Sequence, residues 1–313
     1  MARVLVTGCC GFIGSNLVES LIGKGFEVSG IDDMSTGRPH NTDGMDYEFH
    51  RGSVNDRKLL MKALEGADFV LHHAAIPSVP QSISDPLLTN SANVDGTLSV
   101  LVCARDAGVK RLVFASSSSV YGNNPELPKK ETMRPDPASP YALMKLTGET
   151  YCRLFTEIYG FETVSLRYFN IFGPRQNPDS QYSAVIPKFI KLMLRGEMPT
   201  IFGDGSQSRD FSFVDNVVEA NMLSMKAPKA AAGKAYNIAC GERTTLTGLV
   251  KMINGMIGKD IKPLHAAERE GDIMHSLADI SLAGRMLGYQ PKVLFREGLE
   301  RTVAWYKGGG GHG

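Results

Sequence analysis

A tyrosine and a lysine four positions apart, with a run of serines upstream, are the residues best suited to chemistry in this sequence. Tyr141 and Lys145 are separated by about one helical turn, so both would project from one face of a helix. A nearby ammonium lowers the pKa of a tyrosine hydroxyl and makes it a better base. A hydroxyl from the serines at 116–119 could share the proton of a substrate hydroxyl. Y-x-x-x-K is common on exposed helices, so the pair indicates a catalytic site only together with a second site in the sequence.

That second site is a glycine turn near the start of the chain. Gly8, Gly11 and Gly14 form G-x-x-G-x-x-G between a strand-like run and an amphipathic helical pattern. Glycines there let the backbone approach a pyrophosphate, and the following helix N-terminus favours the anion. Asp32 ends the second strand-like run, where an acid binds ribose hydroxyls and repels a 2′-phosphate, which favours NAD over NADP. The other residues expected around this cofactor are Phe12, Ile13, Asp33, Ser35, Thr36 and Gly37.

Composition narrows the class of protein. The formal net charge is +1, with 42% hydrophobic and 21% charged residues, so no overall basic field favours nucleic acid. The five cysteines show neither a disulfide framework nor metal-ligand spacing. No apolar run reaches the roughly 18 residues of a membrane span, and Met1–Thr7 is strand-like, unlike a signal peptide. We therefore expect a cytoplasmic protein with no metal, nucleic-acid or membrane partner.

The elements that must position these residues alternate between strands and helices. Strands are predicted at Arg3–Thr7, Phe26–Ile31, Tyr47–His50, Asp68–His72, Arg111–Ala115 and Thr163–Tyr168, and helices at Phe12–Lys24, Lys58–Leu64, Leu87–Ala107 and Pro140–Tyr159. This alternation predicts a doubly wound parallel α/β sheet of the Rossmann type. Its carboxyl edge would carry both sites.

The regular alternation of strands and helices ends at about residue 170. Helices are predicted at Ala184–Arg195, Val214–Met225, Thr245–Ile257 and Leu294–Tyr306, with strands at Thr200–Phe202 and Ala235–Ile238. We predict a dinucleotide-binding domain at 1–170, on which later segments such as 211–240 pack, and a smaller substrate-binding C-terminal lobe at 171–307. The Gly-rich tail at 308–313 is expected to be flexible.

Several motifs together are highly specific. They are VTGCCGFIGSNL, His72-His73-Ala74-Ala75, ASSSSVYG, SPYALMK, LRYFNIFGPRQ, GDGSQSRDF and REGDI. Over nearly its whole length the chain resembles the extended short-chain dehydrogenases/reductases of the nucleotide-sugar epimerase branch. The resemblance implies a 4-epimerase with tightly bound NAD, in which Tyr141 takes the proton of the sugar O4, assisted by Lys145 and Ser117. Ser118 and Ser119 are rivals of Ser117 within the serine run.

The resemblance also assigns binding residues and an assembly. Further cofactor contacts are expected from Ser53, Val54, His73, Ala74, Ala75 and Phe169. Substrate contacts are expected from Ser78, Ser117, Ser118, Ser119, Tyr141, Asn170, Val185, Ile201, Arg209, Arg269, Asp272 and Ser276, with the two arginines clamping the diphosphate. Relatives of this kind form homodimers through helices that match Leu87–Ala107 and Pro140–Tyr159.

Three positions indicate which member of the branch this is. Dehydratases of the family carry Asp-Glu, and decarboxylases a glutamate at the second position, where this chain has Ser118 and Ser119. Ser276 stands where a bulky tyrosine closes the sugar pocket in relatives restricted to UDP-glucose and UDP-galactose, so it leaves volume for a 2-acetamido group. We therefore expect interconversion of UDP-GlcNAc and UDP-GalNAc, with the non-acetylated pair as further candidate substrates. The alternatives are a UDP-glucose 4-epimerase proper, a UDP-glucuronate 4-epimerase, against which Asn170 argues, a sugar reductase, and an NAD-binding protein without catalysis.

Overall fold

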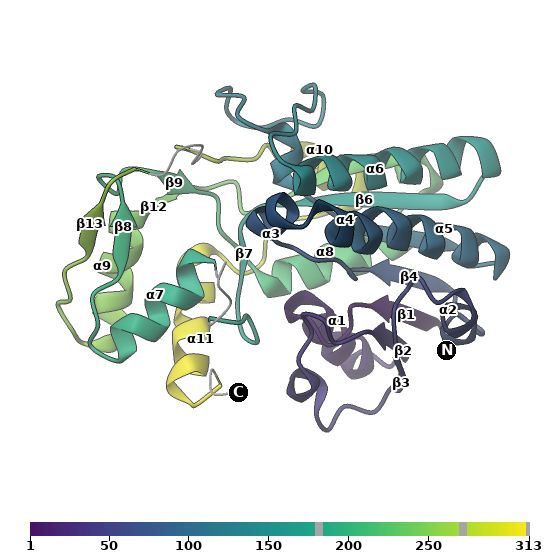
Figure 1. Ribbon diagram of the computed structural model, residues 1–313, viewed down its shortest axis with the longest axis horizontal. Helices are drawn as coiled ribbons and strands as arrows, with labels where there is room; N and C mark the ends of the chain where they lie inside the picture. The colour runs from purple at the N-terminus through teal and green to yellow at the C-terminus, as the bar shows by residue number, and fades with distance from the viewer. Residues whose placement is uncertain (179–183, 269–273, 311–313) are drawn as a thin grey trace.

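A seven-stranded, entirely parallel sheet forms the centre of the larger lobe in the computed structural model, which describes residues 1–178, 184–268 and 274–310 (Figure 1). In spatial order its strands are β3 (Glu48–Arg51), β2 (Glu27–Asp32), β1 (Arg3–Thr7), β4 (Phe69–His72), β5 (Arg111–Ser117), β6 (Glu162–Tyr168) and β11 (Lys234–Ile238). Each neighbouring pair is parallel. The prediction of a doubly wound parallel sheet is confirmed.

Helices cover both faces of this sheet, which explains the nearly continuous apolar character of its strands. Side chains alternate between the faces, so Val4 and Val6 pack with one group of helices and Leu5 with the other. The first face is covered by α1 (Phe12–Gly23), α8 (Val214–Lys226) and α10 (Ser281–Leu287). The second face is covered by α2 (Arg57–Ala63), α5 (Gly96–Asp106) and α6 (Pro140–Tyr159). Segments from the second half of the chain therefore return to complete the larger lobe.

The single helix predicted over Leu87–Ala107 is wrong in detail. Helix α4 (Pro86–Asn90) runs into a π-helical turn at Ser91–Asp95 and then into α5, and a short α3 (Val79–Ser84) precedes them. A π-turn inserts an extra residue into the helix and often marks a functional region. Here the turn contains Asn93, whose buried amide exchanges two hydrogen bonds with the backbone of Ile76 at 2.8 and 3.2 Å. The amide thereby holds a loop that carries part of the site.

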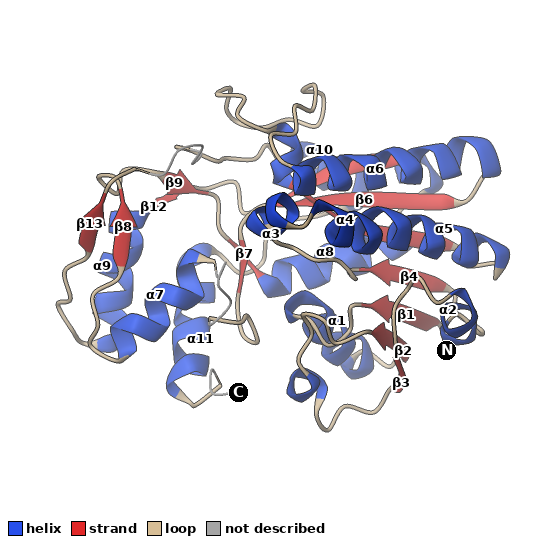
Figure 2. Cartoon of the chain, in the orientation of Figure 1, coloured by secondary structure: helices blue, strands red, loops and turns tan. Residues whose placement is uncertain are grey.

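The smaller lobe packs around a separate apolar cluster. Its helices are α7 (Val185–Leu194), α9 (Leu246–Ile257) and α11 (Phe295–Lys307), seen on the left of Figure 2. Phe172, Phe211, Phe213 and Phe295 form edge-on and stacked ring contacts inside the cluster. Three two-stranded sheets complete the lobe's connections: β7 (Ile171–Phe172) with β10 (Ser212–Phe213), β9 (Ser208–Arg209) with β12 (Thr244–Thr245), and β8 (Thr200–Phe202) with β13 (Leu264–Ala266).

The carboxyl ends of β1 and β4 point toward the smaller lobe (Figure 2), and β5 and β6 run parallel to them. Ligands of open α/β sheets bind at this edge. Over the described residues, no helix combines the length and the apolar character that crossing a membrane requires.

Candidate active site

A cavity of about 740 Å³ lies at the carboxyl edge of the sheet and contains most of the residues singled out in the sequence. Those that line it are Gly8, Gly11, Phe12, Ile13, Gly14, Asp32, Asp33, Ser35, Thr36, Ser53, Val54, His73, Ala74, Ala75, Ser78, Ser117, Tyr141, Lys145 and Asn170. The glycine turn and the Tyr/Lys pair, more than 120 positions apart in sequence, therefore share one cavity.

The glycine turn has a backbone shape that leaves no room for side chains, so another group can approach its backbone closely. Gly8 has φ +68°, and a Cβ on Gly14 would lie 2.0 Å from the carbonyl oxygen of Gly8. The hydroxyl of Thr7, directly before the turn, accepts hydrogen bonds from the backbone N–H groups of His73 and Ala74, both at 3.1 Å. The turn and the end of β4 are thus held together at backbone level. A glycine cradle at a helix N-terminus fits the pyrophosphate of a dinucleotide.

Asp32 lies at the end of β2, beside this turn. Its carboxylate accepts the backbone N–H groups of Cys10 at 2.9 Å and Met34 at 2.8 Å. Burial raises the pKa of Asp32, while these two hydrogen bonds oppose the rise. Gly37 does not line the cavity, but a Cβ there would lie 2.8 Å from a carboxylate oxygen of Asp32. Its glycine leaves space for the acid.

The Tyr/Lys pair is fixed by the start of α6. The hydroxyl of Ser139 caps the helix at the N–H of Ala142, and Ser82 of α3 accepts the N–H of Tyr141 at 3.0 Å. The ammonium of Lys145 is buried, donates to the carbonyl of Ala115 at 2.7 Å, and lies 5.8 Å from the ring centre of Tyr141. The two side chains therefore face one another at the end of β5.

Burial shifts both pKa values toward the neutral forms. It raises the pKa of Tyr141 to about 12, against a lowering hydrogen bond from Ser117. It lowers the pKa of Lys145 to about 8, against the raising charge of Glu149. A positively charged ligand group beside Tyr141 would therefore favour its ionised form.

Within the serine run, the structure separates Ser117 from its rivals. Ser117 lines the cavity, whereas Ser118 and Ser119 do not. The hydroxyl of Ser117 also accepts the N–H of Ser119 at 3.1 Å, which starts a short helical turn and turns the chain away from the cavity. The geometry thus favours Ser117 as the serine that acts with Tyr141.

A buried ion pair below this centre was missed in the sequence. Glu149, one turn beyond Lys145, accepts two hydrogen bonds from Arg167 at 2.9 and 2.7 Å and one from the hydroxyl of Ser116. Arg167 also donates to the hydroxyl of Tyr121 at 2.9 Å. The spacing of four residues places Glu149 on the same face of α6 as Lys145, which the sequence could have shown. Its partner Arg167 lies on β6, and no local spacing links the two.

Two histidines, the buried His72 and the half-buried His73, have structural contacts that the sequence did not indicate. His72 contacts the hydroxyls of Thr7 at 2.7 Å and Thr97 at 3.0 Å, and so links β1 to α5. His73 contacts the hydroxyl of Tyr168 at 3.0 Å. Burial lowers the pKa of both histidines to about 3, so both are neutral. Neither is suited to act as a general base near neutral pH, and both position the cavity wall.

Only some of the residues predicted to bind substrate line the cavity. Asn170 lines the cavity in a left-handed conformation (φ 40°), and its amide donates to the hydroxyl of Ser276 at 3.1 Å and to the carbonyl of Asp210 at 3.0 Å. Ser276 does not line the cavity itself but contacts Asn170, which does. Phe169, Val185, Ile201 and Arg209 do not line the cavity, and Phe169 and Ile201 are fully buried. Arg269 and Asp272 lie outside the described residues.

The family model of the NAD dependent epimerase/dehydratase family matches residues 4–239 of this chain. A UDP-glucose 4-epimerase of Mycolicibacterium smegmatis is 37% identical over 97% of this chain and 98% of its own length.

Two solved structures are similar throughout. The UDP-N-acetylglucosamine 4-epimerase of Methanobrevibacter ruminantium M1, in complex with UDP-N-acetylmuramic acid, is 41% identical with a TM-score of 0.94, covering 98% of this chain and 99% of its own. The UDP-glucuronic acid 4-epimerase of Bacillus cereus, in complex with UDP-glucuronic acid and NAD, is 32% identical with a TM-score of 0.90 and the same coverage.

Proposed function

This chain belongs to the NAD dependent epimerase/dehydratase family, and on that premise we propose that it interconverts UDP-GlcNAc and UDP-GalNAc. It is a UDP-sugar 4-epimerase, an isomerase, and its cofactor is NAD. The finer assignment rests on the geometry of its own residues. The observation that carries the 4-epimerase chemistry is that Tyr141, Lys145 and Ser117 line the same cavity as the glycine turn.

The cavity suits the cofactor at two places. The backbone of the glycine turn would hold the pyrophosphate, since side chains are sterically excluded at Gly8 and Gly14. The carboxylate of Asp32 would bind the ribose hydroxyls and disfavour a 2′-phosphate. When bound, NAD would supply reversible hydride transfer at the sugar C4, with return of the hydride to the opposite face.

The chain's own residues then handle the proton. Tyr141 takes the proton of the sugar O4, and Ser117 shares that hydrogen bond. The ammonium of Lys145, held by the carbonyl of Ala115, stabilises the tyrosinate. When the hydride has returned, Tyr141 gives the proton back to O4. No proton is consumed overall, as an isomerase requires.

The choice of the acetylated sugar rests on Ser276 and Asn170. The hydroxyl of Ser276 accepts hydrogen bonds from the amide of Asn170 at 3.1 Å and from the N–H of Asp210 at 3.2 Å. A small residue there leaves volume beside the cavity wall for a 2-acetamido group. The Asn170 amide, so oriented, would bind a sugar or phosphate oxygen.

The test is incubation of the protein as purified, without added cofactor, with UDP-GlcNAc, UDP-glucose and UDP-glucuronate in turn. We expect UDP-GlcNAc to reach its equilibrium with UDP-GalNAc, resolved by chromatography or NMR, and NAD to be released when the protein is denatured. Stoichiometric consumption of NAD(P)H would indicate a reductase instead. Absence of UDP-GlcNAc conversion would overturn the proposal, and conversion of UDP-glucose or UDP-glucuronate alone would select the corresponding alternative.

Replacing Ser276 by tyrosine should remove activity on the acetylated pair while retaining turnover of UDP-glucose, because the ring would fill the space of the acetamido group. The measurement is kcat/KM for UDP-GlcNAc and UDP-glucose, with a loss of about 10-fold or more expected on the former only. Ser276→Ala is the matched control, since it removes the hydrogen bonds to Asn170 and Asp210 without adding bulk. Equal losses on both sugars in Ser276→Tyr would contradict a gate at this position.

We also propose a homodimer through the helices α4, α5 and α6. Large apolar side chains are exposed on α4, at Leu87 (84% exposed) and Leu88, on α6, at Leu143 (55%), and on the neighbouring α3, at Ile83. Such a patch on neighbouring helices is typical of a protein interface. Leu87→Glu should shift the protein from dimer to monomer in light scattering, whereas Leu294→Glu, at an exposed site beside α11 (53%), should not. A monomeric wild-type protein would refute the assembly.

A further inference from the structure

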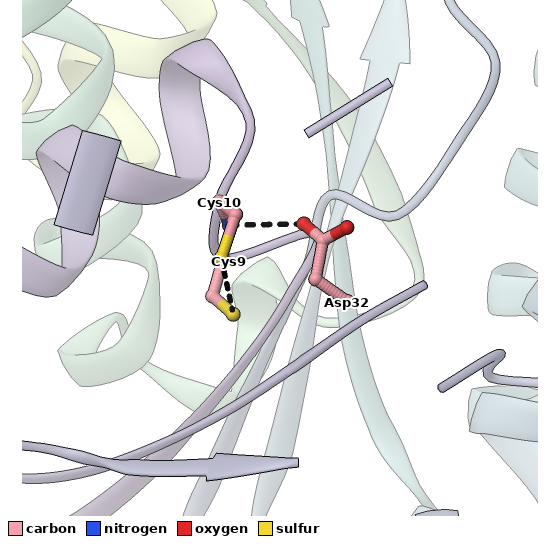
Figure 3. A group of neighbouring side chains, drawn as sticks. All are labelled: Cys9, Cys10 and Asp32. Carbon is pink, nitrogen blue, oxygen red and sulfur yellow. Dashed lines mark hydrogen bonds between the residues drawn. The ribbon is translucent and has the colours of Figure 1, made fainter. Parts of the chain in front are cut away.

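Two adjacent cysteines and an aspartate converge beneath the glycine turn (Figure 3). The thiols of Cys9 and Cys10 are 0% and 1% exposed, and the N–H of Cys10 donates to the carboxylate of Asp32 at 2.9 Å. The two sulfurs and a carboxylate oxygen all lie within 4.8 Å of one another. Within 1–178, 184–268 and 274–310, no other group of three His, Cys, Asp or Glu side chains is this compact. Adjacent cysteines and an acid 22 positions later match no usual ligand spacing, so no metal site was expected from the sequence.

The spacing of these atoms fits a tetrahedral cation. The sulfurs of Cys9 and Cys10 are 3.8 Å apart, and the hydroxyl of Tyr47 lies 4.0 Å from the first and 3.8 Å from the second. Two Zn–S bonds of about 2.3 Å at a tetrahedral angle place their sulfurs about 3.8 Å apart. The two sulfurs are therefore spaced like two corners of a tetrahedron before any ion binds, and Asp32 brings the charged oxygen within 4.8 Å of both.

We propose that Cys9, Cys10 and Asp32 form a binding site for a thiophilic divalent cation of the Zn²⁺ and Cd²⁺ class. Sulfur ligands select such ions over Mg²⁺ and Ca²⁺, which prefer oxygen. Binding forms two metal–sulfur bonds and releases the two thiol protons to solvent, with no change of oxidation state. Neither thiol lines the cavity, so the ion enters as the turn opens.

The site would compete with the cofactor. This step rests on the proposed function, because it uses Asp32 as the acid that binds the ribose. A carboxylate that ligates a cation is withdrawn from the ribose hydroxyls, so cation and NAD weaken one another by the same factor. The cation site would thus inhibit the enzyme by displacing its cofactor.

The probe is Cd²⁺, titrated into reduced, metal-free protein as purified. We expect one Cd²⁺ per chain and thiolate-to-Cd²⁺ charge-transfer absorption in the ultraviolet. Cys9→Ala and Cys10→Ala should each weaken binding at least tenfold and reduce this absorption, while Cys103→Ala and Cys152→Ala, at buried thiols elsewhere, should change neither. Equal binding by wild type and both turn variants would overturn the site.

A second measurement needs no variant and therefore covers the case in which the turn variants fail to fold. The ¹¹³Cd NMR shift of the wild-type complex should report two sulfur ligands, and a shift typical of oxygen ligation alone would overturn the site. Because the protein is expected to purify with bound NAD, saturating Cd²⁺ should release NAD from the wild-type protein, measured in the filtrate. If the two-sulfur signal persists and no NAD is released, the cation site stands and the proposed contact of Asp32 with the ribose is wrong.

Discussion

Replacing Tyr141 by phenylalanine should lower kcat for epimerisation by about 10²–10⁴-fold, the range found for loss of a general base, while the fold and bound NAD are retained. The change removes one hydroxyl at the end of α6 and leaves the ring, so the helix N-terminus and the contact of the Tyr141 N–H with Ser82 persist. The measurement is kcat on the preferred UDP-sugar, together with the NAD content of the purified variant. Tyr159→Phe, at an exposed tyrosine of the same helix, is the matched control and should leave kcat unchanged.

The sign of the pH dependence follows from the same roles of Tyr141 and Lys145. The reacting form needs Tyr141 ionised, and burial raises its pKa to about 12 in the absence of ligands, so the rate should rise with pH on the acid side. Lys145, whose pKa burial lowers to about 8, supplies the charge that favours the tyrosinate only below that pH. Lys145→Met removes the charge, so the rising limb should move to higher pH and the rate at pH 7 should fall. An unmoved limb in this variant, or a Tyr141→Phe enzyme with at least half the wild-type kcat, would contradict the assigned roles.

The parts of this site that could be predicted from the sequence are those whose residues lie close together in the chain. The glycine turn lies between a strand and a helix, and Tyr141 and Lys145 lie one helical turn apart, so neither needs knowledge of distant contacts. Asp32 could be placed because it ends a strand whose neighbour is known from the order of a doubly wound sheet. The strand boundaries agree within one or two residues for the same reason, since buried parallel strands are continuous apolar runs.

What the sequence did not reveal depends on pairs that are far apart in the chain. Ser276 reaches Asn170 across 106 positions, and the two-residue strands β7, β9, β10 and β12 have no periodicity to detect. The π-turn at Ser91–Asp95 has no periodicity that separates it from an ordinary helix, and it is accompanied by the buried bond of Asn93 to Ile76. The contact of Arg209 with the diphosphate stays a prediction; in the structure its guanidinium donates to the carbonyls of Ser208 and Met274.

The largest effect on stability should come from Glu149→Ala, with a loss of about 3–5 kcal/mol in the free energy of unfolding. The side chains of Glu149 and Arg167 are 8% and 5% exposed, and their two hydrogen bonds form a bidentate pair. Burial by itself lowers the pKa of Arg167, but the Glu149 carboxylate holds it above its ordinary value. Truncation of the acid therefore leaves a charged guanidinium buried without its counter-ion. Urea unfolding of wild type and variant measures the difference.

Glu157→Ala is the matched control, because Glu157 lies on the same helix and pairs with Arg153 at 2.7 Å, but both side chains are about half exposed. Water screens that pair, so its loss should cost no more than about 1 kcal/mol. The double variant Glu149→Leu/Arg167→Met should recover much of the stability, since replacing both ions removes the uncompensated charge. If Glu149→Ala were no more destabilising than Glu157→Ala, the buried pair would not hold β6 to α6. A double variant as unstable as the single one would show instead that the hydrogen bonds to Ser116 and Tyr121 provide the stability of this region.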